Sequence, residues 1–202
     1  IWPVQMISGP DDSLVVSDEG NHTISFWSKD GKKLNSWGTH GSEDGELNRP
    51  SGITFDANGD MYVVDTMNHR VQKFTVDGKF ISTFGSYGDG DGQFNMPWGI
   101  GIDPNDGAIV IGDWRNDRVQ KFSSEGEYLL QFGTSGSERG QLNRPAGVTI
   151  DGHSDIYVAD RGNHRVQLFN TAGEFVDVFL GDAVLSKSGR TYIMANPKVL
   201  RS

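Results

Sequence analysis

The chain has 202 residues, carries a formal net charge of −9 and contains no cysteine. The lack of cysteine excludes disulfides and cysteine-ligated metals, and an acidic chain is a poor partner for phosphate backbones, whose binding depends on clustered Lys and Arg. No apolar run is long enough to span a membrane. The chain begins at Ile1, so we expect that a targeting segment could precede it, and the localisation stays unknown.

The strongest feature of the sequence is a motif that occurs four times. In its second copy, residues 61–74, an apolar run ends in Asp65, a polar turn built on Asn68 follows, and a second alternating run ends in Phe74. Two such runs separated by turn formers indicate a β-hairpin. The aspartates that end the first run are Asp18, Asp65, Asp113 and Asp160, spaced by 47, 48 and 47 residues. A constant period of this length is typical of a repeat architecture.

In chain order, each repeat predicts four short strands. The first follows a Pro-x-Gly, at residues 50–52, 97–99 and 145–147, with a degenerate copy at residues 2–7. The hairpin supplies the second and third strands, and the fourth follows a Gly turn. A long Gly-rich loop then leads to the next repeat, and we expect three apolar residues to anchor these loops between neighbouring units: Leu47, Phe94 and Leu142.

These units predict an all-β fold, a β-propeller of four-stranded antiparallel blades. The second strands are apolar at nearly every position, which fits sheets covered on both faces by adjacent blades. A two-layer sandwich or a β-solenoid is the alternative, but neither naturally supplies a four-strand unit with a long connector at constant spacing. The expected blades span about 1–47, 48–94, 95–142 and 143–181.

The repeats resemble the NHL repeat. The resemblance rests on Pro-x-Gly-Val, Ile-Tyr-Val-Ala-Asp and Asn-His-Arg-Val-Gln, with Asn163-His164 and Asn68-His69 at the positions that name the family. It covers residues 1 to about 181. The resemblance implies a propeller, most often six-bladed, that serves as a binding platform in bacteria and in tripartite-motif ubiquitin ligases. A smaller enzymatic branch includes the amidating lyase of peptide hormones. We therefore expect four blades of a six-bladed ring, from a fragment of a longer protein.

The pattern ends at Gly181, where no further loop or Pro-x-Gly follows. Asp182 is a good helix N-cap and later apolar residues fall near helical spacing, although Pro197 should end or kink the helix. We expect residues 182–202 to form a helical insertion or linker, as the resemblance also implies. The competing interpretation is a strand at residues 191–195.

The innermost strand of each blade should line the central channel. In the amidating lyase, histidines that bind zinc directly follow the Pro opening this strand, and the matching positions here are Val4, Ser51, Trp98 and Ala146. None of these is a metal ligand of that kind, so the resemblance does not extend to the metal site. We expect Ser51, Trp98 and Ala146 to line the channel, without a metal or a cofactor.

The recurring polar residues favour structural roles. Asp65, Asp113 and Asp160 are expected to accept backbone N–H groups of the turn that follows them, because a catalytic group is usually needed once and not in every blade. Equivalent histidines lie too far apart around a ring to share one ion. We therefore expect each of these turn histidines to pack against its neighbour: His22, His69 and His164. His40 and His153 lie in loops.

The acidic segment Asp89–Asp91 lacks the further carboxylates and terminal Glu of a calcium loop. We interpret it as a flexible acidic connector.

The residues that break the repeat are the better candidates for binding. Trp114, Arg115, Met67 and Arg161 lie in the hairpin turns, beside arginines that recur in the third strands (Arg70, Arg118 and Arg165). In a propeller these turns share a face with the loops between blades. The face would pair Arg and aromatic groups, which are enriched in interface hot spots, with acidic residues of the loops. The alternative is a solvated rim.

The sequence therefore favours a non-catalytic propeller that docks a protein, peptide or small ligand on its loop face, with no catalytic residues. One alternative is a metal-dependent lyase or lactonase-like enzyme that uses the central channel. A second is RNA binding through the Arg-bearing turns, against which the net charge of −9 argues.

Overall fold

The computed structural model describes residues 2–180, which form four four-stranded antiparallel sheets and one small parallel pair. Blade 1 contains β1 (Pro3–Ser8), β2 (Leu14–Asp18), β3 (Thr23–Trp27) and β4 (Lys33–Trp37). Blade 2 contains β5 (Pro50–Phe55), β6 (Met61–Asp65), β7 (Arg70–Phe74) and β8 (Phe80–Phe84). Blade 3 contains β11 (Pro97–Ile102), β12 (Ile109–Asp113), β13 (Arg118–Phe122) and β14 (Tyr128–Phe132). Blade 4 contains β15 (Pro145–Ile150), β16 (Ile156–Asp160), β17 (Arg165–Phe169) and β18 (Phe175–Leu180).

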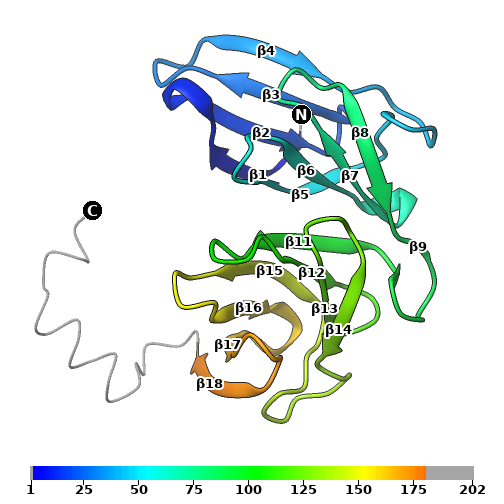
Figure 1. The fold of residues 1–202 in the computed structure, drawn as a ribbon, viewed down its shortest axis with the longest axis vertical. Helices are drawn as coiled ribbons and strands as arrows, with labels where there is room; N and C mark the ends of the chain where they lie inside the picture. Colours follow the sequence, from blue (N-terminus) through cyan, green and yellow to red (C-terminus); the bar gives the residue numbers. More distant parts are fainter. Residues whose placement is uncertain (1, 181–202) are drawn as a thin grey trace, which may run out of the picture.

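The strands of each blade pair in sequence order, and the blades follow one another around an arc (Figure 1). The first strands lie innermost, where β1 contacts β5, β5 contacts β11 and β11 contacts β15. The short pair β9 (Ser86–Tyr87) and β10 (Gln93–Phe94) lies within the loop between blades 2 and 3. The all-β architecture of four-stranded antiparallel blades is thus confirmed, with four blades present.

Within residues 2–180, helical structure is confined to three short 3₁₀ turns, η1 (Pro10–Asp12), η2 (Thr66–Asn68) and η3 (Arg161–Asn163). In this part of the chain, no helix has the length and the apolar character of a membrane-spanning helix. The helical segment expected at residues 182–202 lies outside the described residues.

The apolar cores lie between the blades. β6 and β12 are buried along their whole length, because a neighbouring sheet covers each face. In β16 buried and half-buried residues alternate, since a described neighbour covers one face only. Leu47, Phe94 and Leu142 are fully buried, each in a different core between two blades. The prediction that these residues anchor the long loops is confirmed.

The Gly of each Pro-x-Gly allows neighbouring inner strands to approach closely. A Cβ added at Gly52 would lie 2.5 Å from the carbonyl oxygen of Trp98, and one added at Gly99 would collide with that of Ala146. The pairing register also shifts directly after the Pro, between Pro50 and Ile53 in blade 2, with equivalent shifts in blades 3 and 4. Such a bulge redirects the intervening side chains, so the residue after each Pro departs from the regular alternation.

Candidate functional site

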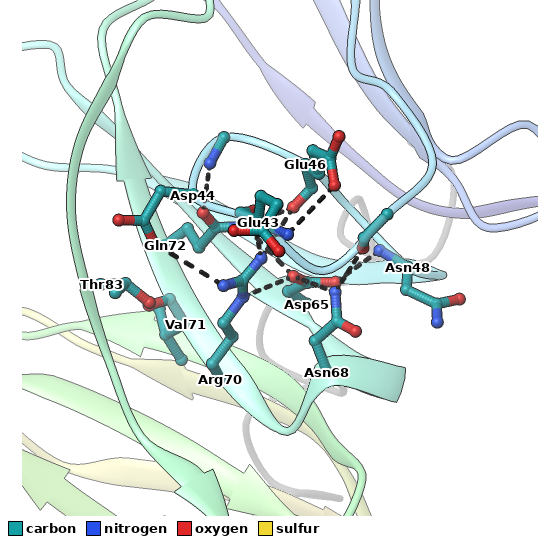
Figure 2. Close-up of polar contacts among 12 residues, drawn as sticks. Glu43, Asp44, Glu46, Asn48, Asp65, Asn68, Arg70, Val71, Gln72 and Thr83 are labelled. Carbon is teal, nitrogen blue, oxygen red and sulfur yellow. Dashed lines mark hydrogen bonds and ion pairs between the residues drawn. The ribbon is translucent and has the colours of Figure 1, made fainter.

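A buried carboxylate holds the hairpin of blade 2 to the loop that precedes this blade. Asp65 is fully buried, and its Oδ2 accepts hydrogen bonds from Asn68 at 2.8 Å, from Nε of Arg70 at 2.9 Å and from Gln72 at 3.1 Å (Figure 2). Its Oδ1 accepts the backbone N–H of Asn48 at 2.6 Å. The carboxylate thus satisfies donors from the loop, the turn and the third strand.

The arginine and the glutamine of this network extend it into the loop. Arg70 donates to the carbonyl oxygens of Glu43 and Glu46, and Gln72 donates to that of Glu46 at 2.7 Å (Figure 2). Gln72 also accepts the backbone N–H of Gly45. We call this arrangement of an Asp, an Asn, an Arg and a Gln around the loop the clamp.

The clamp recurs in blades 3 and 4. Asp113 binds Arg118 at 2.9 Å and Asp160 binds Arg165 at 2.7 Å, and both arginines also donate to loop carbonyl oxygens. Burial raises the pKa of Asp113, while the backbone N–H of Asn95 and the Arg118 guanidinium oppose that rise. In blade 1, Thr23 and Ser25 occupy the positions of the Arg and the Gln.

Backbone N–H groups of the following turn bind the carboxylate in blade 1 only, at an aspartate for which this was not predicted. Asp18 accepts the turn N–H groups of Gly20 and Asn21, both at 3.0 Å. In blades 2 to 4 the expectation is wrong, because the carboxylate accepts the N–H of the loop Asn and the side chains of the clamp instead. The structural role is the same, but the carboxylate holds a longer segment of chain than its own turn.

The clamp also changes the interpretation of the recurring arginines. Arg70, Arg118 and Arg165 have side chains only 8–11% exposed, and each is bound to the Asp of its own blade. They are therefore structural groups of the fold and are not free to contact a partner. The sequence carried a signal for this, an Arg five residues after each Asp, across the hairpin turn.

A left-handed residue ends each hairpin turn, and in blades 1 to 3 it accepts a hydrogen bond from the following blade. His69 has φ 56° and its Nδ1 accepts the backbone N–H of Met96 at 3.0 Å, and His22 accepts that of Arg49 in the same way. In blade 3, Asp117 takes the position and accepts the N–H of Arg144 at 2.7 Å. Burial lowers the pKa of His69, with Arg115 adding to the effect while Asp113 and Asp65 oppose it.

Two positions per blade meet at the inner end of the hairpin turn and differ from blade to blade. One is the residue after the Pro of the first strand, and the other is the residue after the clamp Asp. In blade 2 the hydroxyl oxygens of Ser51 and Thr66 lie 2.7 Å apart, whereas in blade 3 the rings of Trp98 and Trp114 lie 6.0 Å apart. The equivalent pairs are Val4 with Glu19 in blade 1 and Ala146 with Arg161 in blade 4.

Trp114 stands at the centre of a cationic and aromatic cluster. It is half-buried, and the guanidinium carbons of Arg115 and Arg144 lie 5.5 Å and 5.4 Å from its ring centroid. Both arginines are exposed, and within residues 2–180 neither forms an ion pair. Arg144 was not identified from the sequence. The residues at the same repeat position, directly before the Pro, are Arg49 and Met96, so this position shows no constant residue type from which Arg144 would stand out. We call Trp98, Trp114, Arg115 and Arg144 the Trp–Arg cluster.

A cavity of about 210 Å³ lies where the four inner strands converge. Trp98 and Ala146 line it, together with Val4, Ile100 and Val148. Ser51, the third residue expected in the channel, is fully buried and donates a hydrogen bond to the carbonyl oxygen of Trp98 at 2.8 Å. Because Trp98 both lines the cavity and contacts Trp114, the cavity and the Trp–Arg cluster share one wall.

The remaining candidate residues are spread over the turns. Met67 is 37% exposed at the turn of blade 2, and Arg161 is exposed at the turn of blade 4. The acidic segment Asp89–Asp91 is held by Arg118, which donates to the carbonyl oxygens of Asp89 and Gly90. No group of three or more His, Cys, Asp or Glu side chains in the described part of the chain is placed to hold a metal ion.

The fold and the clamped repeats define a β-propeller built from four-stranded blades. Residues 47–74, 94–122 and 142–169 match the model of the NHL repeat, each from the loop anchor to the end of the third strand. The chain is therefore an NHL-repeat protein. The first blade, which lacks the Arg and the Gln of the clamp, lies outside the matched residues. No curated protein matches the sequence.

Among solved structures, the chain is similar to a catalytically inactive virginiamycin B lyase from Staphylococcus aureus with quinupristin, at 18% identity and a TM-score of 0.66, over 88% of this chain and 55% of that one. It is similar to a gluconolactonase from Xanthomonas campestris, at 14% identity and a TM-score of 0.68, over 88% and 61%. It is also similar to the WD40 repeats of RRP9, at 14% identity and a TM-score of 0.69, over 89% and 51%. The chain thus spans about half to three fifths of the propellers it matches, and identity at this level shows the fold alone.

Proposed function

We propose that this protein is a binding propeller that docks a protein or peptide on its loop face, with Trp114 at the centre of the contact. The loop face is formed by the hairpin turns at 66–69, 114–117 and 161–164 and by the loops that the clamp holds against them. The observation that carries the proposal is the Trp–Arg cluster, in which an indole lies beside two arginines that form no ion pair within residues 2–180. Trp and Arg are the residues most enriched in interface hot spots.

The fold does not require this cluster. The clamp satisfies the polar groups of the turn in blades 2 and 4 without a Trp at that position, where Thr66 and Arg161 stand instead. The competing account is that Trp114 packs under the loop 86–94. Its aromatic and cation–π contacts are with Trp98, Arg115 and Arg144, none of which belongs to that loop.

We further propose that the complete protein closes a ring of six blades. The chain spans 51–61% of the three solved structures reported above, and the outer faces of blades 1 and 4 have no described neighbour. The division of residues 1–181 into four blades belongs to the same proposal. A structure of the complete protein with another number of blades would overturn it.

The binding proposal is tested on the complete protein with peptides selected from a displayed random library. Trp114→Ala should weaken the binding of the selected peptides by about 1–3 kcal/mol, the range of hot-spot residues, and leave the melting temperature within a few degrees. Leu129→Ala is the matched control, because Leu129 is 51% exposed on the outer strand β14. A large loss of stability, with unchanged binding per folded molecule, would make Trp114 a packing residue and remove the proposed site.

A further inference from the structure

Two groups of arginines on the loop face differ in what their side chains contact. Arg70, Arg118 and Arg165 are nearly buried and bound to carboxylates of the clamp. Arg115 and Arg144 are exposed, and their described side-chain contact is with the indole of Trp114. An indole face beside a guanidinium holds it in place by a cation–π interaction, which leaves the N–H groups free to bind an anion.

Arg115 and Arg144 lie on a face whose loops carry many carboxylates. Exposed carboxylates lie in all three loops of this face: Glu43, Asp44, Asp89, Asp91 and Glu138. One of them, Asp44, lies 3.8 Å from Arg70, which already binds Asp65. Within residues 2–180, none lies within ion-pair distance of Arg115 or Arg144. The positive charges of Arg115 and Arg144 thus have no carboxylate partner in the described part of the chain.

An apolar cavity adjoins these charges. Trp98 lines the cavity of about 210 Å³, and its ring lies 6.0 Å from that of Trp114. The other side chains that face the cavity are aliphatic, except for Gln5: Val4, Ile100, Ala146 and Val148. A ligand that uses both parts of the site needs an anionic group and an apolar group a short distance apart.

We propose that the Trp–Arg cluster and the adjoining cavity bind an acidic peptide segment of a partner protein. This inference rests on the proposed binding function and names the chemistry of the partner. A Glu or Asp side chain of the segment binds Arg115 and Arg144, where charge-assisted hydrogen bonds to guanidinium are the strong ones. An apolar side chain of the same segment enters the cavity against Trp98.

The geometry also sets the spacing of the two peptide side chains. The ring of Trp98 lies 6.0 Å from that of Trp114, and the guanidinium carbon of Arg115 lies 5.5 Å from the Trp114 ring, so Trp98 and this guanidinium are no more than about 12 Å apart. An extended peptide advances about 3.3 Å per residue. We therefore place the apolar residue no more than about three positions from the acidic one.

A single-stranded RNA could also stack a base on Trp114 and place a phosphate on the arginines. A polyanion must, however, lie across the acidic loops of this face on a chain of net charge −9. A single carboxylate interacts mainly with the two arginines beside it and avoids this repulsion, so the observations favour an acidic peptide over RNA.

The test uses the complete protein and two pools of labelled peptides, acetylated and amidated so that their termini carry no charge. In one pool a Glu precedes a Leu or a Phe by two or three positions among random neutral residues, and in the other a Gln replaces the Glu. Fluorescence anisotropy should give at least ten-fold tighter binding of the Glu pool, with affinity that falls as salt is added.

The variants are chosen to preserve the backbone. Arg115→Ala with Arg144→Asn should bring the two pools to within two-fold of each other, and Asn is used because residue 144 has φ 53°, a left-handed conformation that Asn tolerates. Arg49→Asn with Arg139→Ala is the matched control. It removes the same two charges, one from the equivalent left-handed position with φ 56°, and should retain the ten-fold preference. Each variant's melting curve shows whether it is folded.

The outcomes separate this inference from the function on which it rests. If both pools bind equally well and Trp114→Ala abolishes this binding, the proposed recognition of a carboxylate is wrong and the binding function stands. If neither pool binds, the proposal that the partner segment is acidic is wrong. If the peptides selected from the library do not bind either, the proposed binding function is wrong as well. Tighter binding of poly-uridine RNA than of the Glu pool, lost in the same double variant, would assign the site to nucleic acid.

Discussion

The Nδ1 atom of His69 accepts the backbone N–H of Met96, 3.0 Å away, at the entrance to the following blade. The donor Met96 has φ 54° and the acceptor His69 has φ 56°, so two left-handed residues meet across the junction between blades. Asp117 and Arg144 repeat the arrangement one junction later, at 2.7 Å. An imidazole can accept this hydrogen bond only while Nδ1 is unprotonated.

Stability should therefore fall as the pH drops. Burial lowers the pKa of His69, and also that of His22, below the ordinary value near 6.5. Above that value both the folded and the unfolded chain are neutral at these residues. As the pH falls below it, the unfolded chain binds protons that the folded chain resists, so the free energy of unfolding decreases. Thermal unfolding of the complete protein between pH 8 and pH 5 measures the decrease.

The double variant His22→Asn with His69→Asn isolates this contribution. Asn tolerates the left-handed conformation and accepts a hydrogen bond through its side-chain oxygen without titrating. We expect the variant to keep the melting temperature of the wild type near pH 8 and to lose less of it toward pH 5. Parallel pH profiles of the two proteins would show that these histidines do not contribute.

Removal of the clamp carboxylate should be strongly destabilising. Asp65→Ala leaves the Arg70 guanidinium, only 11% exposed, without its carboxylate at 2.9 Å. Loss of one partner of a buried ion pair costs about 3–5 kcal/mol. Chemical denaturation measures this loss.

Asp44→Ala is the matched control, because Asp44 lies 3.8 Å from the same arginine but is 62% exposed. A surface pair contributes about 0–1 kcal/mol. Equal effects of the two substitutions would contradict the assignment of Asp65 as the centre of the clamp.

The close approach of the inner strands predicts a second destabilising change. Gly99→Ala would place a Cβ against the carbonyl oxygen of Ala146, which belongs to the backbone of β15 and cannot rotate away. Overpacking of this kind costs about 1–3 kcal/mol. Gly152→Ala, at a turn with no atom within 4 Å of the added Cβ, should change the melting temperature little. A Gly99→Ala protein as stable as the Gly152→Ala protein would refute the argument.

A protein limited to residues 1–202 should associate in solution. The outer face of blade 1 carries an apolar cavity of about 410 Å³ lined by Met6, Leu14, Val16 and Trp27, and on blade 4 Phe179 is 40% exposed. Exposed apolar patches of this kind favour association. Sedimentation should give a mass that rises with concentration. A monodisperse monomer with a sharp melt at high temperature would contradict this expectation.

The repeat made the fold predictable, because turns, strands and anchors occupy the same positions in every unit. Leu47 could be assigned to the groove between blades from the sequence, since an apolar residue at the end of a Gly-rich polar loop has few other places to go. The role of Asp65 was predictable as structural, but its partners were not. One partner, Asn48, lies 17 positions earlier in the chain, and only the folded hairpin brings it to the carboxylate.

The candidate site was predictable only in part. Trp114 and Arg115 were found because they break the repeat. Arg144 precedes blade 4 and reaches Trp114 across a junction between blades, a contact that has no counterpart in sequence spacing. The placement of Ser51 likewise depends on contacts that only the fold supplies, because its hydroxyl group lies 2.7 Å from that of Thr66 and 2.8 Å from the carbonyl oxygen of Trp98 in the next blade.

The clamp has a consequence for the order in which the chain can become structured. Each connector is held by groups that lie 24–29 residues further along, as Arg70 and Gln72 hold the loop at Glu43 and Glu46. A connector emerging from the ribosome therefore finds its hydrogen-bonding partners only after the hairpin of the following blade has been synthesised. Folding during synthesis should therefore proceed from the amino terminus, and each newly formed blade should fix the connector that precedes it.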